Sequence, residues 1–220
     1  PIVPIGEKLL FPNHPYFLNL GGIANLSLAN DPYLAFDVCP ANRVLNALAE
    51  QMGHEMDAGG SIARTGNIQA ILLDELNALE YYQRTGPRSL PNQFGTDVVL
   101  PLLLNSGHSI PDLLATYCEH NALQIHRSIS DTGRMIHSGE MLVTGGGAFN
   151  EYLMERIAAH LEVMSIKPVV PSAELVQYKE ALIMAFIGVL RWRQENTVLS
   201  SVTGASVPSI GGAFWMGQEA

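Results

Sequence analysis

The sequence has few cysteines, few basic residues and no long apolar run. Cys39 and Cys118 are too few for a disulfide framework and lack the spacing of metal ligands, so we expect a reducing, cytoplasmic setting. Twelve Lys and Arg against 21 Asp and Glu give a net charge of −9. This argues against sequence-independent nucleic-acid binding, which depends on neutralising phosphates. No apolar run reaches the ~20 residues that a membrane helix needs, so no membrane partner is expected.

Several catalytic motifs are missing as well. The glycine patterns of dinucleotide and P-loop sites do not occur, nor does the G-x-S-x-G of hydrolases. The seven histidines are scattered, without the spacing of a metal site. Asp37 and Asp57 are each a candidate for holding Mg²⁺ through water, with turn formation as the alternative. An apolar content of 47% indicates a packed globular protein.

The apolar periodicity predicts an α/β fold. Three strands are expected around the Gly21–Gly22 turn and over residues 34–38, followed by a helix from Ala41. Residues 54–139 alternate polar loops with helical segments, which we interpret as a helical insertion. Strand, helix, strand and helix then follow from residue 141. At least one parallel crossover is required, which defines the α/β class.

Two expectations concern the ends of the chain. The proline-rich residues 1–13 are interpreted as a loop, and the start without Met as a cut through a longer protein. The segment ALIMAFIGVL (residues 181–190) is too short to span a membrane and is expected to lie in a mostly buried helix.

The stretch FLNLGGIANL predicts a β-hairpin. Gly21 and Gly22 at its centre suit a primed two-residue turn, in which both positions need positive φ. In that register Asn19 faces Ala24 and shares an apolar face. Its amide is then either satisfied by the turn backbone, or the side-chain-free turn lets a phosphate approach backbone N–H groups.

Three consecutive glycines, Gly145 to Gly147, separate a buried strand from a helix that begins near Asn150. Glycines remove Cβ atoms where a ligand approaches the backbone, and a helix N-terminus favours negative charge. A tight strand-to-helix turn is the alternative, although three glycines exceed what packing needs. Glu180 begins the apolar part of a later helix, where its carboxylate is either solvated or recruited by a ligand.

Six segments together resemble a known family: FLNLGGIANLSL, FDVCPAN, PRSLPNQFG, VTGGGAFN, KEAL and SVTGA…IGGAF. In this order they are similar to the C-terminal half of anhydro-N-acetylmuramic acid kinase, from Pro1 nearly to the end. That family belongs to the sugar kinase, heat-shock chaperone and actin superfamily. The resemblance therefore implies a ribonuclease H-like ATPase domain over residues 1–220, with the N-terminal domain absent from this chain.

The resemblance implies an ATP-dependent kinase of peptidoglycan recycling. Such an enzyme adds water across the 1,6-anhydro bond of anhydro-N-acetylmuramic acid and phosphorylates the 6-hydroxyl, with ATP and Mg²⁺ as cofactors. The family's general-base aspartate lies upstream of the part that matches Pro1. No catalytic residue is therefore assigned here, and the isolated chain is expected to be inactive. The expected partners are the sugar and ATP, and a homodimer stays open.

Two groups of binding residues are implied by the resemblance. The ATP-binding group consists of Gly21, Gly22, Asn25, Gly145, Gly146, Gly147 and Asn150. The substrate-binding group consists of Asp37, Asn42 and Glu180. The first group matches a phosphate-binding hairpin and an adenosine-side loop, and the second matches residues beside the active cleft.

Two segments depart from the family pattern. Cys39 and Ala41 replace glycines, and Pro91 and Gln93 replace a glycine and an acid. The departures keep two alternatives open. One is a kinase for a different sugar, and the other is a non-enzymatic nucleotide-binding or interaction module of the same superfamily.

Overall fold

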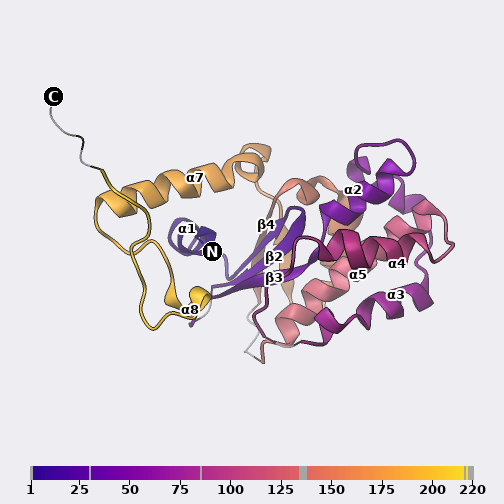
Figure 1. Ribbon diagram of the computed structural model, residues 1–220, viewed down its shortest axis with the longest axis horizontal. Helices are drawn as coiled ribbons and strands as arrows, with labels where there is room; N and C mark the ends of the chain where they lie inside the picture. Colours follow the sequence, from indigo (N-terminus) through magenta and orange to yellow (C-terminus); the bar gives the residue numbers. More distant parts are fainter. Residues whose placement is uncertain (1, 30, 85, 134–137, 216, 218–220) are drawn as a thin grey trace.

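A five-stranded mixed sheet lies at the centre of the computed structural model, with helices on both faces (Figure 1). The structure describes every residue except 1, 30, 85, 134–137, 216 and 218–220. The strands are β1 (Tyr16–Leu20), β2 (Ile23–Leu28), β3 (Leu34–Pro40), β4 (Gly139–Thr144) and β5 (Ile166–Val169). Their order is β3-β2-β1-β4-β5. The first three form an antiparallel meander and β4 and β5 run parallel to β1, which confirms the predicted α/β class.

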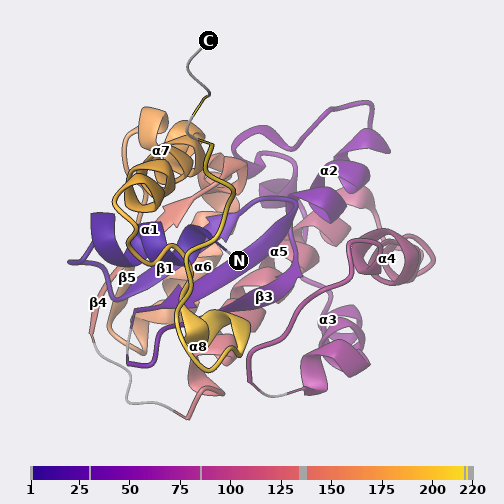
Figure 2. The ribbon, with the colours of Figure 1, turned by 60° about the vertical axis from the view of Figure 1, so that its left-hand side comes forward.

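Helices cover both faces of the sheet. They are α1 (Val3–Leu10), α2 (Asn42–Glu50), α3 (Ala70–Asn77), α4 (Leu100–Leu104), α5 (Ile110–Ser130), α6 (Glu151–Glu162), α7 (Ala173–Trp192) and α8 (Ser200–Thr203). The helices α2 and α5 lie on one side of the sheet, and α1 and α7 lie on the other (Figures 1 and 2). The segment interpreted as an insertion contains α3, α4 and α5, of which α5 packs along β3, α2 and α6.

Alternation along the hairpin builds the main core. Successive side chains of a strand point to opposite faces. On one face of β1 and β2 they are apolar and nearly fully buried, and they join the cluster formed with α5 and α6: Tyr16, Leu18, Leu20, Ala24, Leu26 and Leu28. Each large side chain removed from water stabilises the fold by about 1.5–3 kcal/mol. The opposite face of the same strands is thereby left for other contacts.

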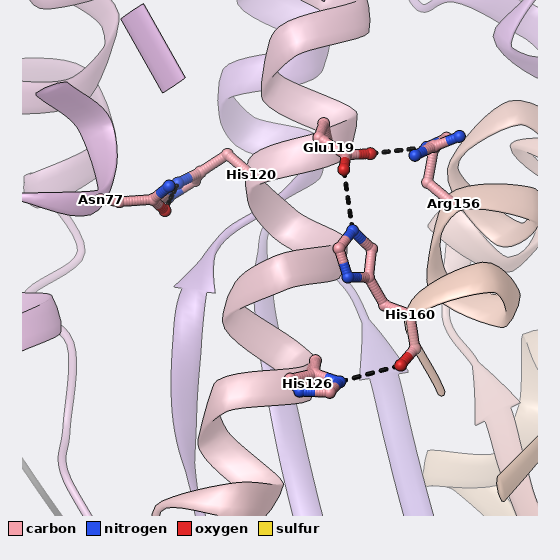
Figure 3. A network of polar contacts seen from close by, with 6 residues as sticks. All are labelled: Asn77, Glu119, His120, His126, Arg156 and His160. Atoms are coloured by element: carbon pink, nitrogen blue, oxygen red, sulfur yellow. Dashed lines mark hydrogen bonds and ion pairs between the residues drawn. The ribbon is translucent and has the colours of Figure 1, made fainter. Parts of the chain in front are cut away.

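Polar contacts join α5 to its neighbours (Figure 3). Glu119 accepts hydrogen bonds from Arg156 Nε at 2.5 Å and from His160 Nε2 at 2.8 Å, while the ring of His126 contacts the His160 carbonyl at 2.8 Å. Burial raises the pKa of the Glu119 carboxyl, but the bonds from Arg156 and His160 outweigh it, so this pKa lies below its ordinary value. The carboxylate thus ties α5 to α6 in its charged form.

His120, on the other side of α5, is held neutral. Its Nδ1 lies 2.9 Å from Asn77 Oδ1, which also accepts from Gln124 Nε2 at 2.8 Å. Asn77 Oδ1 can only accept, so Nδ1 carries the proton. Burial lowers the pKa of His120 to about 3, and nearby Arg127 adds to the effect.

The folded chain should therefore lose stability as the pH falls below about 6.5. The unfolded state binds a proton on His120 between about pH 6.5 and 3 that the folded state does not, so stability rises with pH in this window. The contribution of this histidine is complete above pH 6.5, and about 2 kcal/mol is lost by pH 5. Urea unfolding at pH 5 and pH 7.5 should show a larger difference for the wild type than for His120→Gln. Equal differences in the two proteins would contradict the assignment.

Two sequence expectations about helices are wrong. Residues 3–10 form α1 rather than a loop, because Pro4 lies in the first turn, where its missing N–H has no helical partner to lose. The helix α7 is not mostly buried: Tyr178 and Trp192 are 61% and 69% exposed. This helix contacts α1, β4 and the segment Gly146–Phe149, and its buried residues recur at helical spacing on one side, so its other apolar side chains face outward. No helix in the described part of the chain is long and apolar enough to cross a membrane.

Candidate ligand-binding cleft

The strand register places polar side chains in a row on one face of the sheet. Asn19 pairs with Asn25, and Asn25 pairs with Asp37, across β1, β2 and β3. Residues directly opposite one another in neighbouring strands share a face. The row lies on the face turned away from the main core, near the carboxyl end of β1.

This register corrects the predicted hairpin. Leu20 pairs with Ala24, so residues 21–23 form a three-residue connection, and Asn19 does not face Ala24. Neither Gly21 nor Gly22 is among the glycines with positive φ, so the turn is not of the primed type. The extra residue shifts the register by one, which moves Asn19 from the expected apolar face to the opposite one.

Asp37 is held rigidly in this row. Its Oδ1 accepts from Asn25 Nδ2 at 2.5 Å, and its Oδ2 accepts from the Leu90 N–H at 2.7 Å. The Asp37 N–H donates to the Arg88 carbonyl at 3.0 Å, and the Tyr81 hydroxyl donates to the Asp37 carbonyl at 2.8 Å. Asp37 therefore fixes the loop over residues 87–90 against β3.

A cavity of about 490 Å³ opens over the polar row. The sheet contributes the row itself, α1 and α7 each contribute a carboxylate, and the loop 87–90 contributes a guanidinium. The polar side chains named here are Glu7, Asn19, Asn25, Asp37, Arg88 and Glu180. Glu180 is exposed, and no described residue hydrogen-bonds to it, so its carboxylate is available to a ligand. Amides and carboxylates that converge in this way suit a ligand rich in hydroxyl groups.

Sequence reasoning missed Arg88 and Glu7. The Arg88 guanidinium lies 5.1 Å from the centre of the Tyr81 ring, and its Nη2 donates to Ser128 Oγ at 3.1 Å. Its segment, PRSLPNQFG, carries part of the family resemblance, but it has no periodicity that would place the Arg88 side chain in the site. Glu7 could have been found by reading Pro4 as the first turn of a helix.

Two of the three consecutive glycines are required by packing. A Cβ on Gly145 would lie 2.7 Å from the carbonyl of Leu20, and its φ is +83°. A Cβ on Gly147 would lie 2.7 Å from the Leu20 Cβ and 2.9 Å from Asn42 Oδ1. Gly146 is exposed, and its nearest neighbour would be Asn42 Nδ2 at 3.6 Å. Only Gly146 is therefore free of a packing role, and its surface is open to a ligand.

The hairpin turn, α2 and the glycine loop form one assembly. Asn42 Nδ2 donates to the Leu20 carbonyl at 2.9 Å, and the Asn42 N–H donates to the Gly21 carbonyl at 3.1 Å. The Gly22 carbonyl accepts from the Ala41 N–H at 2.9 Å. The first N–H groups of α2 are thus already bonded within the chain. The assembly adjoins the cavity through Asn19, whose Oδ1 lies 2.7 Å from the position of a Cβ on Gly145.

Asn150 lies at the end of the glycine loop, where it caps α6. Its Oδ1 accepts from the Leu153 N–H at 3.0 Å, as is usual for an N-cap asparagine. The ten residues predicted from the sequence to bind ligands thus lie in three places. Asn25, Asp37 and Glu180 line the cavity wall. Asn150 caps α6, and the other six form the hairpin–glycine assembly: Gly21, Gly22, Asn42, Gly145, Gly146 and Gly147.

The residues that depart from the family pattern do not line the cavity. Cys39 is buried and its Sγ donates to Asn121 Oδ1 at 2.9 Å, while burial raises the pKa of the thiol. Ala41 is buried as well. Pro91 and Gln93 are exposed and do not line the cavity. None of the four departures therefore places a changed side chain on the cavity surface.

The described residues do not form a protein-only metal site. None of their groups of three or more His, Cys, Asp or Glu side chains could hold a metal ion. Asp57 is used locally, since its oxygens accept from the N–H groups of Ile62 at 2.8 Å and Ala63 at 2.9 Å. Mg²⁺ commonly binds through one or two carboxylates together with substrate phosphates and water. The cavity carboxylates fit that mode, with Glu180 the least engaged.

A solved structure shares this fold: the activator of the 2-hydroxyisocaproyl-CoA dehydratase from Clostridium difficile with bound ADPNP. It matches with a TM-score of 0.51 at 17% identity, over 88% of this chain and 67% of that one. Together with the sheet order, this likeness shows a ribonuclease H-like ATPase fold, as the sequence resemblance implied.

Within this fold class the chain belongs to the anhydro-N-acetylmuramic acid kinase family, which it matches over residues 1–217. Curated proteins of that name from Vibrio parahaemolyticus and Salinibacter ruber are 30% and 33% identical to it, each over 94% of this chain. The chain spans 57% and 55% of the lengths of those two relatives. The family predicted from the six segments is confirmed.

Proposed function

We propose that this chain is the C-terminal domain of an ATP-dependent anhydro-N-acetylmuramic acid kinase of peptidoglycan recycling. The whole enzyme would work in the cytoplasm and convert 1,6-anhydro-N-acetylmuramic acid to N-acetylmuramic acid 6-phosphate, with ATP and Mg²⁺. Family membership supports the reaction, and the partial span of the relatives supports a domain of a longer protein. A homodimer is the assembly to test first.

The observation that carries the proposal is the cavity beside the glycine loop. Phosphoryl transfer is mostly positioning and charge stabilisation around the reacting oxygens. The Asn19–Asn25–Asp37 row and Glu180 offer groups that would hold sugar hydroxyls. The open surface at Gly146 would admit the nucleotide next to them. ATP, when bound, supplies the phosphoryl group, while these residues bind and orient. The general base would belong to the remainder of the enzyme.

ATP with Mg²⁺ should bind at Gly146. In calorimetric titration of the 220-residue chain, Gly146→Val is expected to weaken binding at least about tenfold, which is about 1.4 kcal/mol. The valine would fill the surface where the nucleotide approaches. Gly188→Val is the matched control, because Gly188 is exposed on α7 with nothing near its Cβ position. Equal affinities in the two variants would place the nucleotide elsewhere.

The reaction itself is tested on the complete gene product. Incubation with ATP, Mg²⁺ and the anhydro sugar should give a product heavier by one water and one phosphoryl group. ATP binding without any such product would favour a kinase for a different sugar.

A further inference from the structure

A buried ion pair lies beneath the cavity and joins α1 to α7. Lys179 Nζ on α7 is 2.7 Å from Glu7 Oε1 on α1, and both side chains are only 3% exposed. The Tyr33 hydroxyl donates to the other oxygen, Glu7 Oε2, at 3.0 Å. Both carboxylate oxygens are therefore engaged, and the ammonium is matched by a charge from a segment far away in the sequence.

One residue away, the backbone of α1 at Gly6 lies directly against a side chain of α7. A Cβ on Gly6 would lie 2.5 Å from Ile183 Cγ2, so only glycine allows α1 to approach α7 this closely. Ile183 follows Lys179 by one helical turn, so both side chains lie on the face of α7 that meets α1. Gly6 with Ile183, and Glu7 with Lys179, therefore fix the position of α7 along α1.

The pair also fixes the rotation of α7. Only Val176, Lys179, Ile183 and Leu190 of this helix are buried, and Lys179 is the only charged one. Successive helical residues point about 100° apart. Lys179 is turned toward α1, so the direction of the next side chain, Glu180, is set as well. Glu180 and Glu7 both line the cavity.

We infer that the Lys179–Glu7 pair, braced by Tyr33, is a positioning device that aims Glu180 at the substrate. The inference rests on the proposed function for the identity of that substrate, the anhydro sugar. Lys179 and Glu7 act through Glu180 and through the seating of α7. Their removal should weaken sugar binding more than nucleotide binding, because α7 carries Glu180 itself but only packs against the segment that contains Gly146.

The test compares steady-state kinetics of variants of the complete gene product. Lys179→Met is expected to raise the KM for the sugar about tenfold, with a clearly smaller change in the KM for ATP. Glu180→Gln should also raise the KM for the sugar about tenfold. The double variant should have the same sugar KM as Glu180→Gln alone, because Lys179 acts through Glu180 and has no further effect once that carboxylate is lost. Multiplying effects in the double variant, or a lower kcat at unchanged sugar KM, would overturn the inference.

Two further variants separate positioning from general loss of stability. The double variant Glu7→Gln with Lys179→Met leaves no uncompensated charge and keeps the acceptor for Tyr33, so it should stay folded and still raise the sugar KM. Arg156→Met breaks a partly buried pair with Glu119 on the far side of the sheet. It should lower the melting temperature without changing the sugar KM. A sugar KM that rises equally in Arg156→Met would show that the pair beneath the cavity has no special role.

A readout without substrate separates this inference from the proposed function. Hydrogen–deuterium exchange of residues 173–183 should rise in Lys179→Met and stay unchanged in Arg156→Met. If the wild type does not phosphorylate the anhydro sugar, the proposed function fails while the exchange result still tests the seating of α7. Unchanged exchange in Lys179→Met would overturn the inference whatever the substrate.

Discussion

Lys179→Met is expected to destabilise the 220-residue chain by about 3–5 kcal/mol, because it leaves the Glu7 carboxylate buried without its counter-charge. Both members of the pair are almost completely removed from water. For a chain of this size the melting temperature should fall by roughly 6–20 °C. Thermal and urea unfolding measure the change directly.

The double variant Glu7→Gln with Lys179→Met should recover most of that loss. The glutamine is neutral and still accepts from the Tyr33 hydroxyl, so no uncompensated charge stays buried. Arg64→Met is the matched surface control: its pair with Glu155 is bidentate, but the side chains are 47% and 57% exposed. That variant should melt close to the wild type. A double variant as unstable as Lys179→Met would mean that packing, rather than charge, accounts for the loss.

The strands and the glycine loop were predictable because their signals are local. Apolar alternation along β1 and β2 and the strand–glycine–helix pattern around Gly145 depend only on neighbouring residues. The hairpin register was not predictable, since a Gly-Gly pair suits both two-residue and three-residue connections. A shift of one residue decided whether Asn19 faced the core or the cavity.

Contacts between residues far apart in the sequence could not be predicted either. Glu7 and Lys179 are 172 positions apart, so no local pattern pairs them. The apolar composition of α7 predicted burial, but burial also depends on how many elements surround a helix. Asp37 and Glu180 were assigned to the substrate by resemblance, and the structure brings them to one cavity. Arg88 also lines that cavity, and although its segment carries part of the resemblance, no local pattern predicted the position of its side chain.

Gly145→Ala is expected to destabilise the chain by about 2–6 kcal/mol. The backbone of Gly145 has φ +83° and ψ 161°, a region used almost only by glycine, and placing a residue with a Cβ there costs about 1–3 kcal/mol. The new Cβ would also lie 2.7 Å from the backbone of Leu20, which cannot move without disturbing β1. Such overpacking typically costs about 1–3 kcal/mol more. Urea unfolding, with the slope checked for constancy, measures the sum.

Alanine substitutions at Gly147 and Gly146 are the matched comparisons for Gly145→Ala. Gly147→Ala should cost about 1–3 kcal/mol, because it meets the Leu20 Cβ and Asn42 but has no positive φ. Gly146→Ala should change stability by less than about 0.5 kcal/mol, since its Cβ position is open. If Gly146→Ala were as damaging as Gly145→Ala, the third glycine would also serve packing. Weak ATP binding by Gly146→Val would then reflect a distorted loop. A stable Gly146→Ala protein leaves ligand access as the physical reason for a glycine at that position.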